Sequence, residues 1–259
     1  MPEGRVTDYD RVADRFDTRY RLYAYDGVRE TVLDFVGAHT TAALEVGCGT
    51  GHWLAVVANA ASERRTLVGL DPSAAMLARA RVVVPSVDLV RARAEELPWP
   101  DATFDRLFCV NALHHFTDRN RFFAEARRVL KPGGGLLTIG KDPHTDRDEW
   151  WVYDYFEETR ALDRERLARV RTLRGEMALA GFAWTESAEA DRVEAVQPAS
   201  EALASGAIDP SFTSQLTVLS AEEFSRGAEK LRQASDAVAG ELQLVTDFRL
   251  YATIGWVGT

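Results

Sequence analysis

The chain has 259 residues, of which 46% are hydrophobic and 27% charged, a composition typical of a soluble globular protein with a sizeable core. Lys and Arg number 31 against 40 Asp and Glu, giving a formal net charge of -9, so a nucleic-acid partner is disfavoured. The two cysteines are too few for a disulfide framework or a structural zinc site, and we expect no metal. No apolar run reaches the roughly 18 residues of a membrane span, and a charged stretch follows Met1, so we expect a cytoplasmic protein without a membrane partner.

The first part of the chain, Tyr9 to Tyr25, predicts one or two amphipathic helices. Apolar side chains recur there at helical spacing between charges, and they are Val12, Phe16, Tyr20 and Tyr23.

From 42 to 140, short apolar runs alternate with helical stretches, which predicts βαβ units and a parallel sheet. The expected strands are Ala42–Gly47, Thr66–Asp71, Val87–Arg93, Phe104–Val110 and Leu136–Gly140. The expected helices are His52–Ala60, Ser73–Arg81 and Arg119–Leu130, the last ending at Lys131, Pro132, Gly133 and Gly134.

After residue 141, an aromatic group precedes two further helices and two further strands. Its members are Trp150, Trp151, Tyr153, Tyr155 and Phe156. Arg160–Ala180 predicts one long helix ended by Gly181. Ser220 and Glu223 have the spacing of a capping box at the start of the next helix, whose apolar stripe is Phe224, Ala228, Leu231 and Val238. We expect the runs 182–197 and 244–257 to complete the sheet.

The segment Glu45–Gly51 is the most specific chemical signal. Glycines at 47, 49 and 51 stand where the first strand meets the next helix, so the backbone can turn tightly and the helix amides can face a nucleotide-like ligand. A G-x-G-x-x-G frame fails, because its third glycine would fall at His52 or Leu54, which disfavours a nicotinamide or flavin cofactor.

Asp71 follows the second strand, 20 residues after Gly51. A carboxylate in that place can accept both hydroxyl hydrogen bonds of a ribose. Without the glycine loop upstream, an acid at a helix N-terminus would be the better explanation of this residue.

The chain resembles the class I S-adenosylmethionine-dependent methyltransferases, in particular the bacterial branch of the ubiquinone/menaquinone-biosynthesis (methyltransferase type 11) family. The resemblance is carried by four blocks in order: Glu45–Gly51, Gly69–Leu77, Ala94–Asp105 running into Asn111–Phe116, and Leu130–Gly134. It implies a Rossmann-like, doubly wound α/β sheet of seven strands, with the last strands antiparallel and helical cap additions. Within a single domain we expect an N-terminal helical cap at 1–30, a cofactor-binding core at 31–142, a cap with the penultimate strand at 143–240 and the last strand at 241–259.

The resemblance also implies roles toward S-adenosylmethionine. Glu45, the backbone of Gly47, Cys48 and Gly49, and Asn111 would lie beside the methionine part. Asp71 would bind the ribose. Pro72 and Met76 would flank the adenine, and Ala94 and Glu95 would contact its edge. One position departs from the family, because Arg93 stands where relatives often have Asp and offers donors alone.

Residues Tyr9, Asp10, Phe16 and Asp17 resemble the aromatic-acid repeat that closes over the cofactor in relatives. Tyr9 is therefore a candidate contact for cofactor or substrate, whereas Phe16 is expected to pack its helix on the core.

His114 and His115 follow the fourth strand, where open α/β sheets bind their ligands, so either is a candidate general base. Since adjacent residues leaving a strand face opposite ways, at most one of them is expected to reach the pocket. The alternative is that neither is catalytic.

The predicted function is methyl transfer, by in-line displacement, to an O, N or C atom of a small-molecule acceptor, whose pocket the aromatic group at 150–156 would shape. The alternatives are a tRNA-modifying methyltransferase, a cofactor-binding module without turnover and, more distantly, a nicotinamide oxidoreductase. The expected oligomeric state is a monomer or a homodimer.

Overall fold

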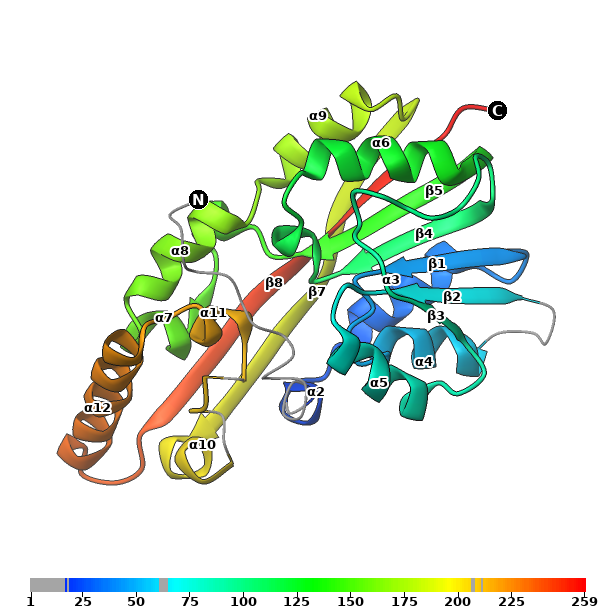
Figure 1. The fold of residues 1–259 in the computed structure, drawn as a ribbon. Helices are drawn as coiled ribbons and strands as arrows, with labels where there is room; N and C mark the ends of the chain where they lie inside the picture. The colour runs from blue at the N-terminus through cyan, green and yellow to red at the C-terminus, as the bar shows by residue number, and fades with distance from the viewer. Residues whose placement is uncertain (1–16, 18, 61–64, 206–207, 211) are drawn as a thin grey trace.

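The computed structural model describes residues 17, 19–60, 65–205, 208–210 and 212–259. A twisted sheet runs through the molecule and helices cover both of its faces (Figure 1). The strands are β1 (Ala42–Val46), β2 (Thr66–Leu70), β3 (Asp88–Val90), β4 (Phe104–Val110), β5 (Leu130–Gly140), β6 (Glu149–Trp150), β7 (Trp184–Pro198) and β8 (Gln243–Trp256).

The helices of the core are α3 (Asp26–Val36), α4 (His52–Ala60), α5 (Ala74–Val83) and α6 (Arg119–Val129). A second group covers one end of the sheet: α7 (Trp151–Tyr155), α8 (Glu158–Arg166), α10 (Ala199–Ser205), α11 (Ser214–Thr217) and α12 (Ala221–Ala237). The remaining helices are α2 (Arg19–Leu22), α9 (Val170–Leu179) and the short 3-10 turns η2 (Leu113–His115) and η3 (Pro143–Thr145).

The strand order is β3-β2-β1-β4-β5-β8, with β7 on the free side of β8. Strands β1 to β5 pair in parallel, and β8 is antiparallel to both β5 and β7. The predicted α/β class, the parallel core and the antiparallel last strands are confirmed. An eighth strand was not predicted: β6 is two residues long and pairs with β8 at Thr246 and Asp247, beyond the point where β5 ends.

Side chains of β1 alternate between two apolar clusters, one on each face of the sheet. Ala43 belongs to the cluster that includes Trp53 and Leu54 of α4. Leu44 and Val46 belong to the other cluster, which includes Phe122 and Phe123 of α6. Burial on both faces explains why this strand is apolar in the sequence except at Glu45.

The expected long helix at 160–180 is wrong, because the chain turns between α8 and α9. Leu167 leaves the helical conformation and is buried. Asp142 Oδ2 accepts a hydrogen bond of 2.9 Å from the Val170 amide, and so satisfies one of the free N–H groups at the start of α9. A partner far away in the sequence therefore ends one helix and begins the next.

Two other helical predictions have clear outcomes. The capping box is confirmed: the Ser220 hydroxyl accepts from the Glu223 amide, and the Glu223 carboxylate accepts from the Ser220 amide. Ala228 and Leu231 are buried as expected, but Val238 lies beyond the end of α12 and is 44% exposed.

Asp105 joins the starts of β1, β4 and β5. Its Oδ2 accepts from the amides of Thr41 and Ala42, each at 2.9 Å, and from the Thr41 hydroxyl; its Oδ1 accepts from Lys131 Nζ at 2.8 Å. Partial burial alone would raise the pKa of Asp105, but these donors lower it well below the usual range.

We expect Asp105→Asn to reduce the free energy of unfolding at pH 7 by about 1–2 kcal/mol, the usual cost of losing charge-assisted hydrogen bonds. Because the folded-state pKa is depressed, this stabilisation is present above the unfolded pKa of about 3.9 and is lost as the pH falls below it. Urea unfolding from pH 7 to pH 3 should show a flatter pH dependence for the variant. Asp101→Asn is the matched control, since that carboxylate is exposed; an equal loss in both variants would contradict the prediction.

Candidate functional site

A cavity of about 400 Å³ lies at the carboxyl ends of β1, β2 and β4, and we call it the large cavity. Every described residue that the sequence predicts for the cofactor lines it: Glu45, Gly47, Cys48, Gly49, Asp71, Pro72, Met76, Ala94, Glu95 and Asn111. Tyr9, Asp10 and Phe16 lie outside the described residues. Asp17 lies within them, and its Oδ1 accepts a hydrogen bond of 2.6 Å from the Thr50 hydroxyl of the glycine loop.

The glycine loop after β1 is fixed by backbone hydrogen bonds and by a close contact. The amides of Gly47 and Cys48 both donate to the Leu70 carbonyl of β2, at 2.7 and 3.0 Å. Gly47 has φ +76°, and a Cβ there would lie 2.5 Å from the Cβ of Ala112, in the loop after β4. This turn therefore requires glycine on both conformational and steric grounds.

Asp71 links the glycine loop to the segment that follows β2. Its Oδ2 accepts from the Gly49 amide and its Oδ1 from the Ser73 amide, each at 2.9 Å. A carboxylate has about four lone-pair sites, so it can accept hydrogen bonds from several donors at once.

Glu45 is a buried carboxylate with an unsatisfied oxygen. The residue is 1% exposed and its Oε2 has no hydrogen-bond partner in the described structure. Burial raises the pKa of Glu45 well above its usual value, and the negative charge of Asp71 raises it further. A cationic or hydrogen-donating ligand beside these two acids would relieve both effects.

Arg93 and Glu95 form one wall of the large cavity. Burial alone would raise the pKa of Glu95, but hydrogen bonds to its Oε1 from Thr117 and from the Asp118 amide lower it instead. Arg93 Nε lies 3.7 Å from Glu95 Oε2. The arginine that departs from the family pattern thus pairs with the acid that the resemblance assigns to the adenine.

His114 and His115 both line the large cavity, so the expectation that at most one reaches it is wrong. They lie in the 3-10 turn η2 rather than in an extended strand, and alternation of side chains does not apply there. Their ring centroids are 3.8 Å apart. Just before them, Asn111 adopts φ +51°, an uncommon conformation for a residue other than glycine.

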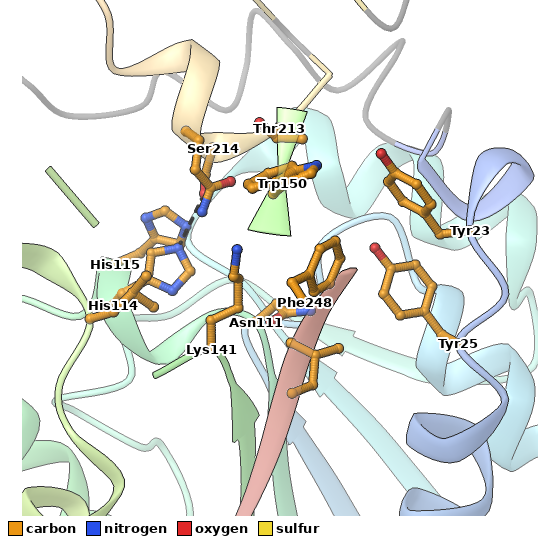
Figure 2. A pocket seen from close by; sticks show the side chains of 13 residues that line it. Tyr23, Tyr25, Asn111, His114, His115, Lys141, Trp150, Thr213, Ser214 and Phe248 are labelled. Carbon is orange, nitrogen blue, oxygen red and sulfur yellow. Dashed lines mark hydrogen bonds between the residues drawn. The ribbon is translucent and has the colours of Figure 1, made fainter. Parts of the chain in front are cut away.

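A second, smaller cavity of about 50 Å³ adjoins the first, and we call it the aromatic cavity. Asn111, His114 and His115 line both cavities. Most of its other lining residues are aromatic or polar: Tyr23, Tyr25, Lys141, Trp150, Thr213, Ser214 and Phe248, which Figure 2 shows, and Gln215. Leu167 and Leu250 complete the wall. His114 Nε2 lies 3.4 Å from the Ser214 hydroxyl of α11.

The predicted aromatic group at 150–156 divides between this cavity and the core. Trp150 lines the aromatic cavity, whereas Trp151 and Phe156 are buried in the main apolar cluster. Tyr153 is buried as well, and its hydroxyl donates to Asp163 Oδ2 at 2.7 Å.

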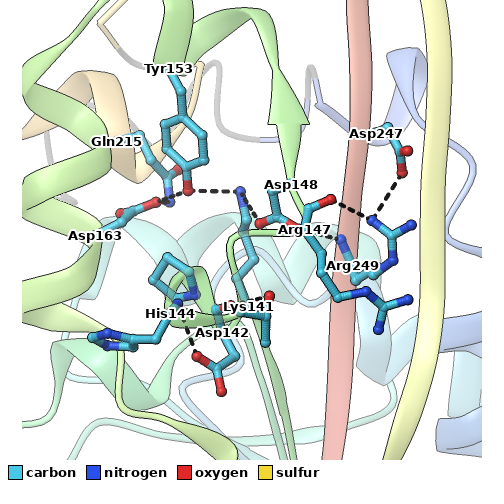
Figure 3. Close-up of polar contacts among 12 residues, drawn as sticks. Lys141, Asp142, His144, Arg147, Asp148, Tyr153, Asp163, Gln215, Asp247 and Arg249 are labelled. Atoms are coloured by element: carbon cyan, nitrogen blue, oxygen red, sulfur yellow. Dashed lines mark hydrogen bonds and ion pairs between the residues drawn. The ribbon is translucent and has the colours of Figure 1, made fainter.

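A buried polar network, which the sequence alone does not reveal, surrounds the aromatic cavity (Figure 3). Lys141 Nζ donates to the Tyr153 hydroxyl at 3.0 Å and lies 3.5 Å from Asp148 Oδ2. Asp163, which is fully buried, also accepts from Arg166 at 2.8 Å and from the Gln215 amide. Lys141 directly follows β5, so the rule that ligands bind at the carboxyl ends of parallel strands could have identified it.

The large cavity contains other side chains that the sequence does not predict there. The rings of Tyr20 and His52 stack with centroids 3.6 Å apart, and both line its wall. Phe116, Thr117 and Arg166 line it too. The helical pattern assigns Tyr20 only to the packing of its own helix.

Comparison with known proteins is consistent with this geometry. Residues 44–138 match the family described as a methyltransferase domain. A probable S-adenosylmethionine-dependent methyltransferase of Mycolicibacterium smegmatis is 38% identical over 94 residues, which cover 36% of this chain and 35% of that protein. A demethylmenaquinone methyltransferase of Bacillus licheniformis is 39% identical over 100 residues, 38% of this chain and 43% of that protein.

Solved structures show the same fold over most of the chain. The YcgJ protein of Bacillus subtilis has a TM-score of 0.62 at 16% identity, covering 91% of this chain and all of its own. The [4+2]-cyclase SpnF has a TM-score of 0.55 at 20% identity, covering 90% of this chain and 80% of its own. Residues 44–138 are therefore similar to a methyltransferase domain, and the chain shares its fold with these solved structures. S-adenosylmethionine is the cofactor of this domain family, while the chain spans less than half of the length of the two curated relatives above.

Three further observations concern the cysteines, possible metal ligands and possible membrane-spanning helices. Cys48 and Cys109 are free and buried, and burial raises the pKa of both thiols. Within the described ranges, three or more His, Cys, Asp or Glu side chains do not gather in a group that could hold a metal ion. None of the described helices is long and apolar enough to cross a membrane.

Gly47→Ala should disrupt the loop, because the new Cβ would clash with Ala112 in an already unfavourable conformation. We expect a loss of about 1–3 kcal/mol in the free energy of unfolding, measured by urea denaturation. Gly140→Ala is the matched control, since a Cβ at Gly140 would meet nothing within 4 Å. Equal stability of the two variants would contradict the close contact between the loops after β1 and β4.

Proposed function

We propose that this chain transfers a methyl group from S-adenosylmethionine to a small-molecule acceptor by in-line displacement. The observation that carries the proposal is the adjacency of the two cavities: one is bounded by the glycine loop and buried acids, and Asn111, His114 and His115 line both. When bound, S-adenosylmethionine supplies a methyl group already activated on a sulfonium sulfur. The protein then needs chiefly to align the reactants and exclude water.

The side chains of the large cavity fit this cofactor. Asp71 has acceptor capacity for ribose hydroxyls, and the unsatisfied oxygen of buried Glu45 favours a positively charged ligand nearby. We assign the methionine part to Glu45 and the loop at 47–49, the ribose to Asp71, and the adenine to the region of Pro72, Met76 and Ala94. Glu95 fits a contact with the adenine edge less directly, because its Oε1 already accepts from Thr117 and Asp118.

For the acceptor, His114 is the better-placed candidate base. Its Nε2 lies 3.4 Å from the hydroxyl of Ser214 in α11, a contact that helps to orient the ring. His115 shares the turn and both cavities. A relative named for demethylmenaquinone suggests a reduced quinone as one acceptor to test.

Asp71→Ala should weaken S-adenosylhomocysteine binding by at least about tenfold, the loss expected when hydrogen bonds to a charged group are removed. Isothermal titration of the wild type and variant with this ligand and its 2′-deoxyribose analogue separates the ribose contact from loop distortion. In the wild type the analogue should bind more weakly, and in the variant the two ligands should bind alike. Asp88→Ala controls for loss of an exposed acid at the start of β3. An analogue penalty that survives in Asp71→Ala would refute the ribose assignment.

Turnover is tested by the release of S-adenosylhomocysteine in the presence of an acceptor panel of phenols, reduced quinones, amines and tRNA. We expect product with at least one small molecule and none with tRNA. Because the same fold occurs in a protein described as a cyclase, the readout must be methyl transfer itself. Tight cofactor binding without product from any acceptor would favour a binding module instead.

A further inference from the structure

The two cavities differ in the charge of their walls. Lys141, His114 and His115 line the aromatic cavity, and no Asp or Glu is among its described lining residues. The large cavity is lined by three carboxylates, by the same two histidines, and by Arg93 and Arg166, which are paired with Glu95 and Asp163. The aromatic cavity therefore favours an anion, whereas Glu45 and Asp71 add negative charge to the wall of the large cavity.

Lys141 is the centre of this positive wall. Its side chain is 8% exposed, and its Nζ lies 4.1 Å from the ring centroid of Trp150 and 4.6 Å from those of Tyr153 and Phe248. The Tyr153 hydroxyl accepts one of the three ammonium hydrogens at 3.0 Å, and Asp148 Oδ2 forms an ion pair with the ammonium at 3.5 Å. Figure 2 shows the amine among the cavity side chains, between the histidines and Phe248.

The nearby acids do not fully compensate the buried charge. Burial lowers the pKa of Lys141, and the negative charges of Asp148 and Asp163 offset that effect in part. Asp163 is already engaged by Tyr153, Gln215 and Arg166. An anionic ligand beside Lys141 would supply the missing stabilisation.

We propose that the methyl acceptor enters the aromatic cavity through an anionic oxygen, that of an ionised phenol, an enolate or a carboxylate, and that this oxygen pairs with Lys141. That the ligand is the methyl acceptor rests on the proposed function, whereas the anion-binding site rests on the geometry of the aromatic cavity. At about 50 Å³ the cavity admits one small functional group rather than a whole metabolite. Lys141 is thus a residue that selects the acceptor.

The probe is 4-nitrophenol, whose anion absorbs visible light and so reports its own ionisation when bound. In the wild type we expect the bound probe to have an apparent pKa lower by about one unit, equivalent to roughly tenfold tighter binding of the anion than of the neutral phenol. Lys141→Met should abolish the shift, and Lys141→Arg should retain part of it. Lys230→Met, which removes an exposed lysine of α12, should leave the shift unchanged.

Other charged and titratable groups surround the cavity, so the shift is read as a difference between the wild type and the Lys141 variants. They are His114, His115, Asp148, Tyr153, Arg160, Asp163 and Arg166. Lys141→Met leaves Asp148 buried without its cation, which could impair folding. The double variant Lys141→Met/Asp148→Asn removes both charges, and it too should lose the shift.

Benzoate and benzamide distinguish a carboxylate from its neutral counterpart, and benzylamine tests a cation. Preference for 4-nitrophenolate supports a phenol or enol, and preference for benzoate supports a carboxylate. The proposal is overturned by an unchanged probe pKa, by tighter binding of benzylamine, by equal binding in the Lys141→Met variants, or by no binding of either anion at millimolar concentration. A parallel titration with S-adenosylhomocysteine tests the proposed function separately, because its failure would leave the anion measurements unaffected.

Discussion

The ligand-binding edge depends on the reversal of strand order between β1 and β4. From β1 the chain proceeds outward to β2 and β3, and then returns to place β4 on the other side of β1. Because both strands are parallel, their carboxyl ends meet at one edge while the loops that follow them diverge. The loops after β1 and β4 come into close contact at Gly47 and Ala112, and both residues line the large cavity.

Electrostatics divide this edge into two compartments. Glu45 and Asp71 face the large cavity, and the proximity of their charges is unfavourable unless a ligand or a proton compensates it. Lys141 lines the aromatic cavity, and the two histidines line both cavities. Exclusion of water would strengthen every one of these interactions, since the attraction of opposite charges increases as the local dielectric falls. Under the proposed function, this arrangement would bring together two reactants of opposite charge.

The local sequence predicts the residues that line the large cavity but not most of those that line the aromatic cavity. Glu45, the glycine loop and Asp71 lie at the ends of consecutive strands, so strand periodicity and turn chemistry place them without knowledge of distant contacts. The aromatic cavity is built from η2, β6, α11, β8 and the residues that follow β5 and α8, whose side chains meet only through tertiary packing. The break between α8 and α9 was missed for the same reason, because Asp142 caps α9 from outside it. The paired histidines were misjudged because η2 replaces an extended backbone with a tight turn.

The length of β8 has a consequence for how such a protein can change. Residues 251–256 of this strand pair with β5, whereas Thr246 and Asp247 pair with β6, and Phe248 lies between them in the aromatic cavity. A single strand thus joins β5 to the segment that carries β6 (Figure 1). Substitutions at its amino-terminal half can reshape the aromatic cavity while the register with β5 is preserved. The fold thereby allows the aromatic cavity to diverge in evolution while the large cavity is retained.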